Sequence, residues 1–73
     1  EKVNEVKLIR NWEKLMGKTI AKYTQEIYVS KKRLFLRVAS SPLKQELSYS
    51  RNKIIELVNG EIGEGYISEV IIR

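Results

Sequence analysis

Apolar residues recur every three or four positions at the start of the chain, and charged residues fill the gaps between them. The series consists of Val3, Val6, Leu8, Ile9, Trp12, Leu15 and Met16. This period predicts an amphipathic helix from about Asn4 to Met16, whose apolar stripe faces a core. Gly17 can adopt the left-handed conformation that ends a helix. A short further turn of helix is expected from Thr19 to Tyr23.

A period of two replaces this pattern after Thr24. Apolar residues alternate with polar or aromatic ones from 26 to 30 and again from 33 to 38, which predicts two antiparallel strands. Lys31-Lys32 separates them. Neither lysine is the Asn or Gly that a two-residue turn favours, so we expect a slightly longer loop.

The second half predicts a helix followed by a strand. Ser40-Ser41-Pro42 resembles a helix start, with Ser41 as the cap and Pro42 in the first helical position. One long helix is expected to run to about Asn59, where Gly60 closes or breaks it. Residues 66–73 predict a last strand, with Ile67, Val70 and Ile72 in the core. The α-β-β-α-β order predicts a single α+β domain over residues 1–73, with a three-stranded sheet and helices on one face.

Composition excludes several classes of function. The 73 residues contain neither cysteine nor histidine, which removes disulfides, thiolate metal sites and the commonest general base. No acidic pair has a catalytic spacing, and Gly63-Glu64-Gly65 stands between a helix and a strand, the wrong order for a phosphate-binding loop. We therefore expect no enzyme, no cofactor and no metal.

Charge and hydropathy bear on partners and compartment. The net charge of +5 favours polyanions or acidic protein surfaces, although solubility alone would also explain it. No apolar run approaches the roughly 20 residues that span a bilayer, so no membrane partner is expected and the cytoplasm is the default location. Because the chain starts at Glu1 and not at Met, we expect an N-terminal segment to precede it.

Aromatic and basic residues of the hairpin form a candidate nucleic-acid surface. Strand alternation turns Tyr28 and Phe35 away from the predicted helices, close to Arg37 and to the basic turn Lys31-Lys32-Arg33. Aromatic side chains that alternate with Lys and Arg on an open sheet face can bind single-stranded nucleic acid, because its nucleobases stack on the aromatic rings. The alternative is a patch that packs on another protein or forms a homodimer. Trp12 could also bind a partner, but its place on the apolar stripe favours a core role.

An ordered set of positions resembles the DciA family of bacterial DNA replication, long listed as a domain of unknown function. The set is Trp12, Gly17, Ile20, Ala21 and Thr24, then Leu34, Leu36 and Val38, then Ser40-Ser41 and Glu46-Leu47. Trp12, Gly17 and Thr24 are its structural landmarks. The resemblance covers nearly the whole chain. It implies a KH-like fold similar to the first domain of the initiator DnaA, a role as loader of the replicative helicase, and affinity for DNA.

One position departs from the family. Leu43 stands where DciA proteins often carry a tryptophan, and we expect it to be partly exposed at the start of the second helix. The leading hypothesis is a non-enzymatic adaptor that binds the helicase through Ser41, Pro42, Leu43 and Tyr49. Lys31, Lys32, Arg33 and Arg37 would guide it to single-stranded DNA. The alternatives are a direct single-strand binder that stacks bases on Tyr28 and Phe35, and a purely structural dimerisation module.

Overall fold

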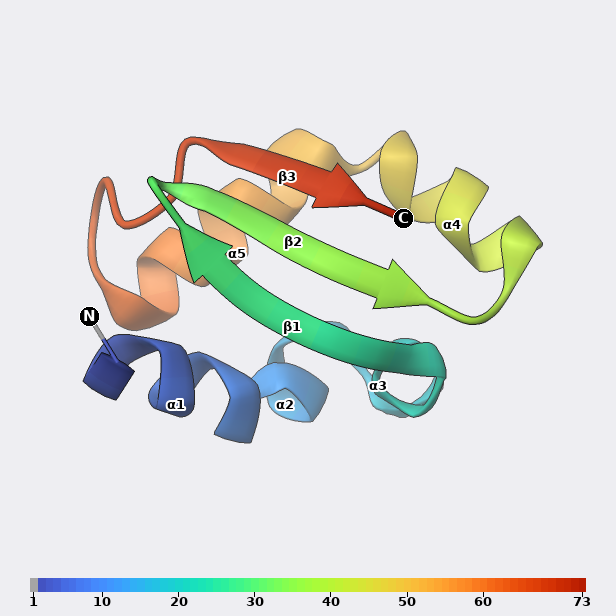
Figure 1. Cartoon of the computed structure of the whole chain (residues 1–73), viewed down its shortest axis with the longest axis horizontal. Helices are drawn as coiled ribbons and strands as arrows, with labels where there is room; N and C mark the ends of the chain where they lie inside the picture. The colour runs from blue at the N-terminus through green and yellow to red at the C-terminus, as the bar shows by residue number, and fades with distance from the viewer. Residues whose placement is uncertain (1) are drawn as a thin grey trace.

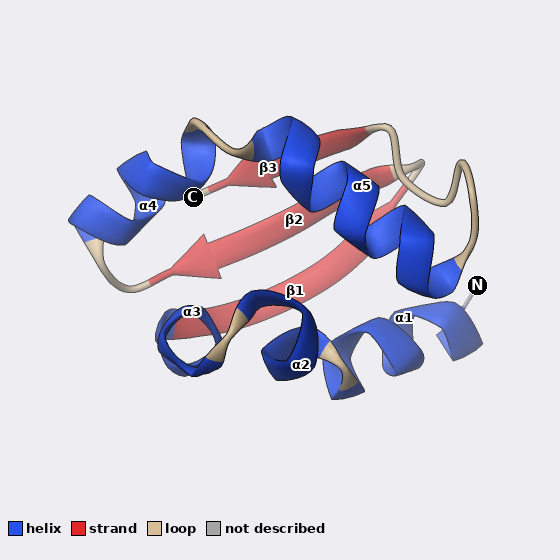
Figure 2. Cartoon of the chain, turned by 180° about the vertical axis from the view of Figure 1, so that it is seen from behind, coloured by secondary structure: helices blue, strands red, loops and turns tan. Residues whose placement is uncertain are grey.

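The computed structural model describes residues 2–73 and contains one mixed sheet (Figure 1). Its strands are β1 (Thr24–Ser30), β2 (Arg33–Val38) and β3 (Glu69–Ile72), in the order β1-β2-β3. β1 is antiparallel to β2, whereas β3 is parallel to it. A parallel neighbour requires a crossover, and the intervening helices supply it across one face of the sheet (Figure 2). The predicted α+β class and element order are confirmed.

The first predicted helix is in fact broken. It divides into α1 (Lys2–Arg10) and α2 (Trp12–Met16), and α3 (Lys18–Tyr23) follows after Gly17. Between α1 and α2, the Asn11 side-chain amide donates to the Lys7 carbonyl oxygen at 3.0 Å. The Asn11 backbone N–H also bonds Lys7 O at 3.1 Å and reaches Leu8 O, three residues back, at 3.2 Å, so the helix tightens at a residue that the apolar period does not mark. Gly17 then takes φ 94°, a left-handed value that suits glycine.

The second helix is also broken. α4 (Ser41–Ser48) and α5 (Arg51–Ile62) are separated by Tyr49 and Ser50, whose N–H groups donate to carbonyls three residues back, at 3.2 and 2.9 Å. The Ser48 hydroxyl donates to Gln45 O at 2.7 Å, so local serine bonding replaces the helical pattern there. Gly60 neither closes nor breaks the helix, because α5 continues past it.

Ser40, not Ser41, caps α4. Ser40 has extended backbone angles, and its hydroxyl oxygen accepts the Leu43 N–H at 3.3 Å. Ser41 is therefore already helical, and Pro42 follows as the second helical residue. Proline is tolerated in the first turn because its missing N–H would have no partner there. The last strand is also shorter than predicted, because β3 starts at Glu69.

The hairpin between β1 and β2 is tighter than predicted. Ser30 pairs with Arg33, which leaves a two-residue turn of Lys31 (φ 53°) and Lys32 (φ 64°). Both lysines adopt left-handed angles that cost a non-glycine residue about 1–2 kcal/mol. Ser68 supports the turn, because its N–H donates to Lys32 O at 2.8 Å and its hydroxyl donates to the same oxygen at 3.4 Å.

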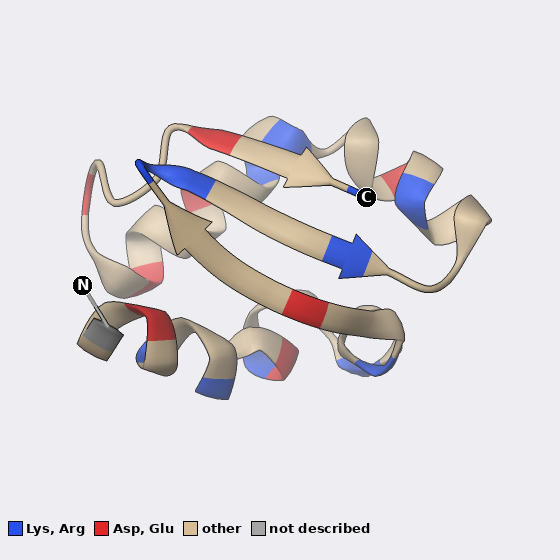
Figure 3. Cartoon of the chain, in the orientation of Figure 1, with Lys and Arg blue, Asp and Glu red and all other residues tan. Residues whose placement is uncertain are grey.

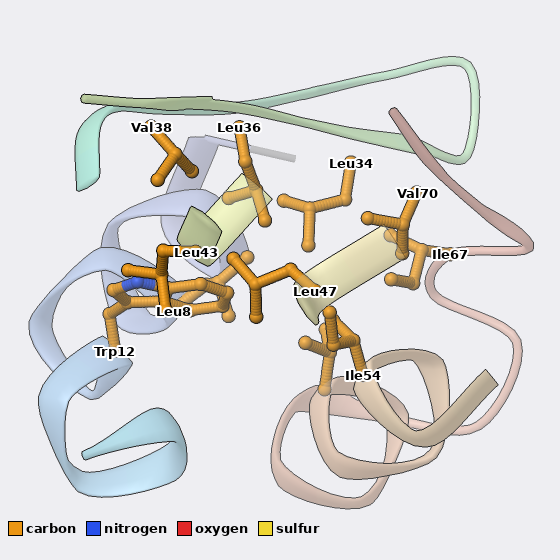
Figure 4. Close-up of a cluster of buried hydrophobic side chains, with 11 residues drawn as sticks. Leu8, Trp12, Leu34, Leu36, Val38, Leu43, Leu47, Ile54, Ile67 and Val70 are labelled. Carbon is orange, nitrogen blue, oxygen red and sulfur yellow. The ribbon is translucent and has the colours of Figure 1, made fainter. Parts of the chain in front are cut away.

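One hydrophobic core lies between the sheet and the helices (Figure 4). It consists of Leu8, Trp12, Leu34, Leu36, Val38, Leu43, Leu47, Ile54, Val58, Ile67 and Val70. The predicted core role of Trp12 is confirmed. Its indole N–H donates to the Thr24 hydroxyl at 3.1 Å, and that hydroxyl donates to Ile20 O at 2.6 Å. The landmark pair Trp12 and Thr24 therefore joins α2 to the start of β1.

The stripe predicted for the first helix is only partly buried. Leu8 and Trp12 lie in the core, but Val3, Val6 and Ile9 are exposed. Residues four apart share one helix face, and α1 and α2 turn the face of Leu8 and Trp12 toward the sheet. The burial predicted for the other three residues is wrong, because the series mixes two faces of α1.

Candidate partner and nucleic-acid surfaces

Neither a metal cluster nor a membrane-spanning helix occurs in the described chain. Within residues 2–73, no three side chains of His, Cys, Asp or Glu are grouped so that they could hold a metal ion. In the same range, no helix has the length and apolar character needed to cross a bilayer. The candidate sites are the surface residues predicted to bind a partner protein or nucleic acid.

The open face of the sheet carries a central apolar row. Tyr28 on β1 pairs with Phe35 on β2, which pairs with Ile71 on β3. The two rings stack on each other, with centroids 4.6 Å apart and planes inclined by 6°. From the β3 side, the Arg73 guanidinium lies over the Phe35 ring at 5.1 Å. Phe35 is therefore already engaged by both neighbours, so a base that stacked on it would have to displace one of them.

Ion pairs flank this row on both sides. Arg37 Nη2 lies 3.0 Å from Glu26 Oε1, and Arg33 Nε lies 3.4 Å from Glu69 Oε1. Both pairs are exposed, and such pairs contribute about 0–1 kcal/mol. Arg33 and Arg37, two of the basic residues predicted to contact nucleic acid, are therefore each weakly paired with a carboxylate.

The other two basic residues predicted to contact nucleic acid, Lys31 and Lys32, lie at the hairpin tip. Lys31 and Lys32 are exposed, and no carboxylate of residues 2–73 forms an ion pair with either. Figure 3 shows this tip as a basic end of the sheet that continues into the start of β2. The structure thus brings Lys31, Lys32 and Arg33 together. Arg37 lies four residues further along β2, roughly 13 Å away at 3.3 Å per residue.

The predicted helicase-binding residues lie at the two ends of α4. Ser41 and Pro42 are exposed at its start, and Tyr49 follows its end with 80% of its surface exposed. The Gln45 amide donates to the Tyr49 hydroxyl at 3.4 Å. Leu43 differs from expectation, because it is only 9% exposed and belongs to the core. With Ser40 as the cap, Leu43 shares the inward face of α4 with Leu47, four residues on.

One polar junction was not apparent in the sequence. The Glu5 carboxylate on α1 accepts the Val29 N–H of β1 at 2.9 Å. The Tyr66 hydroxyl is buried and has no hydrogen-bond partner among the described residues. Burial, and then the nearby Glu5 carboxylate, raise the pKa of Tyr66. These residues are far apart in the chain, and no local pattern links them.

The fold defines a class, a small α+β domain whose helices cover one face of a three-stranded mixed sheet. The chain belongs to the DciA family, because residues 1–72 match the family described as "Dna[CI] antecedent, DciA". Membership implies a role in loading the replicative helicase, and DciA proteins perform it without catalysis. The resemblance found in the sequence is confirmed. No curated protein and no solved structure matches the chain.

Proposed function

We propose that this domain is a helicase-loading adaptor that docks on the replicative helicase beside α4 and contacts single-stranded DNA with its hairpin tip. Family membership over residues 1–72 is the observation that carries the helicase role. The assignment of surfaces rests on exposure and charge. The two surfaces lie on different elements, so one domain can hold both partners at once.

Tyr49 is the best candidate for the helicase anchor. It combines 80% exposure with a position in the turn between α4 and α5. Tyrosine supplies a rigid apolar ring and a polar end, and such residues are enriched among those that dominate binding energy. Ser41 and Pro42 would form a second contact at the start of α4. Leu43 lies beneath that contact and would support it by packing more than by direct binding.

A binding assay with the replicative helicase of the same organism tests this surface. Tyr49→Ala should weaken binding by at least about tenfold, the threshold of an interface residue that matters. Tyr23→Ala is a matched control, since Tyr23 is also an exposed tyrosine but lies on α3. Leu43→Asp is not informative, because it places a charge in the core. Equal binding by wild type and Tyr49→Ala would show that the docking site lies elsewhere.

DNA contact is proposed for Lys31 and Lys32, with Arg33 and Arg37 in support. The lysines are exposed and form no ion pair within residues 2–73, and the tight turn presents both at the same tip. Contacts of lysine with phosphate are independent of sequence and weaken as salt rises. Because Phe35 is already stacked, the geometry favours backbone contacts over base stacking.

Fluorescence anisotropy with a labelled oligothymidine over a series of salt concentrations tests the DNA contact. Lys31→Gln with Lys32→Gln should lower the magnitude of the salt slope by about 1.4, or about 0.7 for each lost contact on a single strand. Arg51→Gln with Lys53→Gln removes the same charge from α5 and should change the slope little. An unchanged slope in the hairpin variant would contradict the assignment.

The open sheet face supports a second candidate function, a direct single-strand binder that stacks bases on Tyr28 and Phe35. If a base stacks on Phe35, Phe35→Ala should cost about 1–3 kcal/mol of binding free energy. A homodimer through this face is the remaining alternative. Sedimentation velocity at increasing concentration distinguishes it, because a dimer that loses affinity in Phe35→Ala would replace the nucleic-acid interpretation.

A further inference from the structure

The outer side of α1 carries exposed aliphatic residues that the fold does not use. Val3 is 78% exposed, Val6 49% and Ile9 47%. The core takes Leu8 from the same helix instead. β-branched residues are mediocre helix formers, so their presence on an exposed helical surface is not explained by helix stability.

This surface has the shape of a helix-packing face. A shallow open hollow is lined by Val3, Val6, Lys7, Arg10 and Asn11. The first four follow the i, i+3, i+4, i+7 spacing, which is the row that a second helix contacts when it packs along the first. α1 lies at the border of the molecule beyond β1, and for residues 2–73 Figures 1 and 2 show no other helix or strand over its outer side.

The charge of the same surface is positive. Lys7 and Arg10 line the hollow, and neither forms an ion pair within residues 2–73. Within residues 3–10 of α1, the two basic residues Lys7 and Arg10 oppose one acid, Glu5, a net charge of +1 for that segment. Glu5 already accepts the Val29 N–H. An apolar row flanked by unpaired bases is complementary to an apolar row flanked by carboxylates.

We propose that the outer face of α1, formed by Val3, Val6, Lys7 and Arg10, docks an acidic amphipathic helix of a partner protein. DNA phosphates would pair with Lys7 and Arg10, but DNA would leave Val3 and Val6 without an apolar contact. A second copy of the chain would bring Lys7 and Arg10 of both copies together and their charges would repel, because a symmetric pair apposes identical surfaces. This surface lies on a different element from the α4–α5 turn, and it does not depend on the proposed helicase contact.

An NMR titration of the ¹⁵N-labelled domain tests the inference. The probe is a synthetic amphipathic helix of about five turns, with a leucine stripe flanked by glutamates. A second probe replaces each glutamate with lysine. The acidic probe should shift the amide signals of α1, and the basic probe should bind at least about tenfold more weakly, because its charges repel Lys7 and Arg10.

Two variants locate the contact. Val6→Asp and the pair Lys7→Glu with Arg10→Glu should each weaken the acidic probe by about tenfold or more. These residues are exposed, so the melting temperature should change little and should be measured in parallel. Arg51→Glu with Lys53→Glu makes the same charge change on α5 and should leave binding intact.

Several results would overturn the inference. These are the absence of shifts on α1, equal affinity for both probes, or unchanged binding by Val6→Asp. Self-association that Val6→Asp abolishes would identify a second copy as the occupant. Preferential binding of anionic lipid vesicles through α1 would identify a membrane surface. None of these measurements contains helicase or DNA, so their failure is separate from failure of the proposed function.

Discussion

Neighbouring residues on β2 lie in opposite environments. Leu34, Leu36 and Val38 point into the helix-covered core, whereas Arg33 and Arg37 point to the open face with the half-buried Phe35 between them. The covered face is apolar except for Thr24, whose hydroxyl accepts the Trp12 indole N–H. The open face combines a stacked aromatic pair with two exposed ion pairs. Buried and exposed side chains are thus separated across the thickness of one sheet, and substitutions can test each face by itself.

The largest expected effect comes from the covered face. Leu34→Ala should lower the free energy of unfolding by about 2–5 kcal/mol, because it removes buried methyl groups and leaves a cavity. Phe35→Ala, one residue along, should cost only about 0.5–1.5 kcal/mol for the lost ring pair, together with a modest loss of apolar burial. Urea denaturation of both variants measures the contrast. Equal losses would show that the open face is as important for folding as the core.

The next effect concerns the bond that joins α2 to β1. Thr24→Val keeps the shape of the side chain but leaves the buried Trp12 indole N–H without an acceptor. The free energy of unfolding should fall by about 1–3 kcal/mol. Thr19→Val, on the exposed surface of α3, is a control that should change little. An unchanged free energy of unfolding in Thr24→Val would show that the hydrogen bond from the Trp12 indole does not stabilise the fold.

A smaller effect of opposite sign is expected at the hairpin. Lys32→Gly should raise the free energy of unfolding by about 0.5–1 kcal/mol, because glycine adopts the left-handed angle without a Cβ clash. The same change should weaken DNA binding if Lys32 contacts phosphate. Lys44→Gly within α4 should instead cost about 1 kcal/mol. Loss of stability in Lys32→Gly would contradict the observed turn.

The smallest effect should appear only at high pH. The pKa of Tyr66 is raised in the folded state, so the unfolded chain loses this proton first as pH rises above about 10. The contribution of the neutral Tyr66 hydroxyl to the free energy of unfolding is therefore complete below that pH and is lost as the pH rises above it. Tyr66→Phe should remove this decline, and the difference between the two pH profiles of unfolding isolates it from lysine titration. Parallel profiles would contradict the buried position of the hydroxyl.

Periodicity predicted the elements better than their boundaries. Alternation identified both hairpin strands, and the spacing of Trp12 identified it as core. Both helix breaks were missed because they are local tightenings, in which the N–H groups of Asn11, Tyr49 and Ser50 bond carbonyls three residues back, and these bonds do not alter the apolar period. The tight turn was missed because lysine rarely adopts left-handed angles, and contacts from Ser68 stabilise it here.

The candidate surfaces were predicted less completely. The strand pattern correctly placed Tyr28 and Phe35 together on the open face, but it did not indicate that they stack on each other. Leu43 was misplaced because exposure was inferred from its position in the first turn of the helix, whereas its spacing of four from Leu47 places both on the buried face of α4. The Glu5–Val29 bond joins residues that no local rule connects, so only the folded chain reveals it.

Hydrogen exchange of the domain with and without the replicative helicase tests the central claim most directly. The account predicts slower exchange in the turn between α4 and α5, around Tyr49, and at the start of α4 beside Ser41 and Pro42. Because Val70 and Leu34 lie in the core, exchange there should already be slow and should change little. Protection confined to other surfaces, or no protection at a helicase concentration that saturates binding, would contradict the assignment of this turn as the helicase contact.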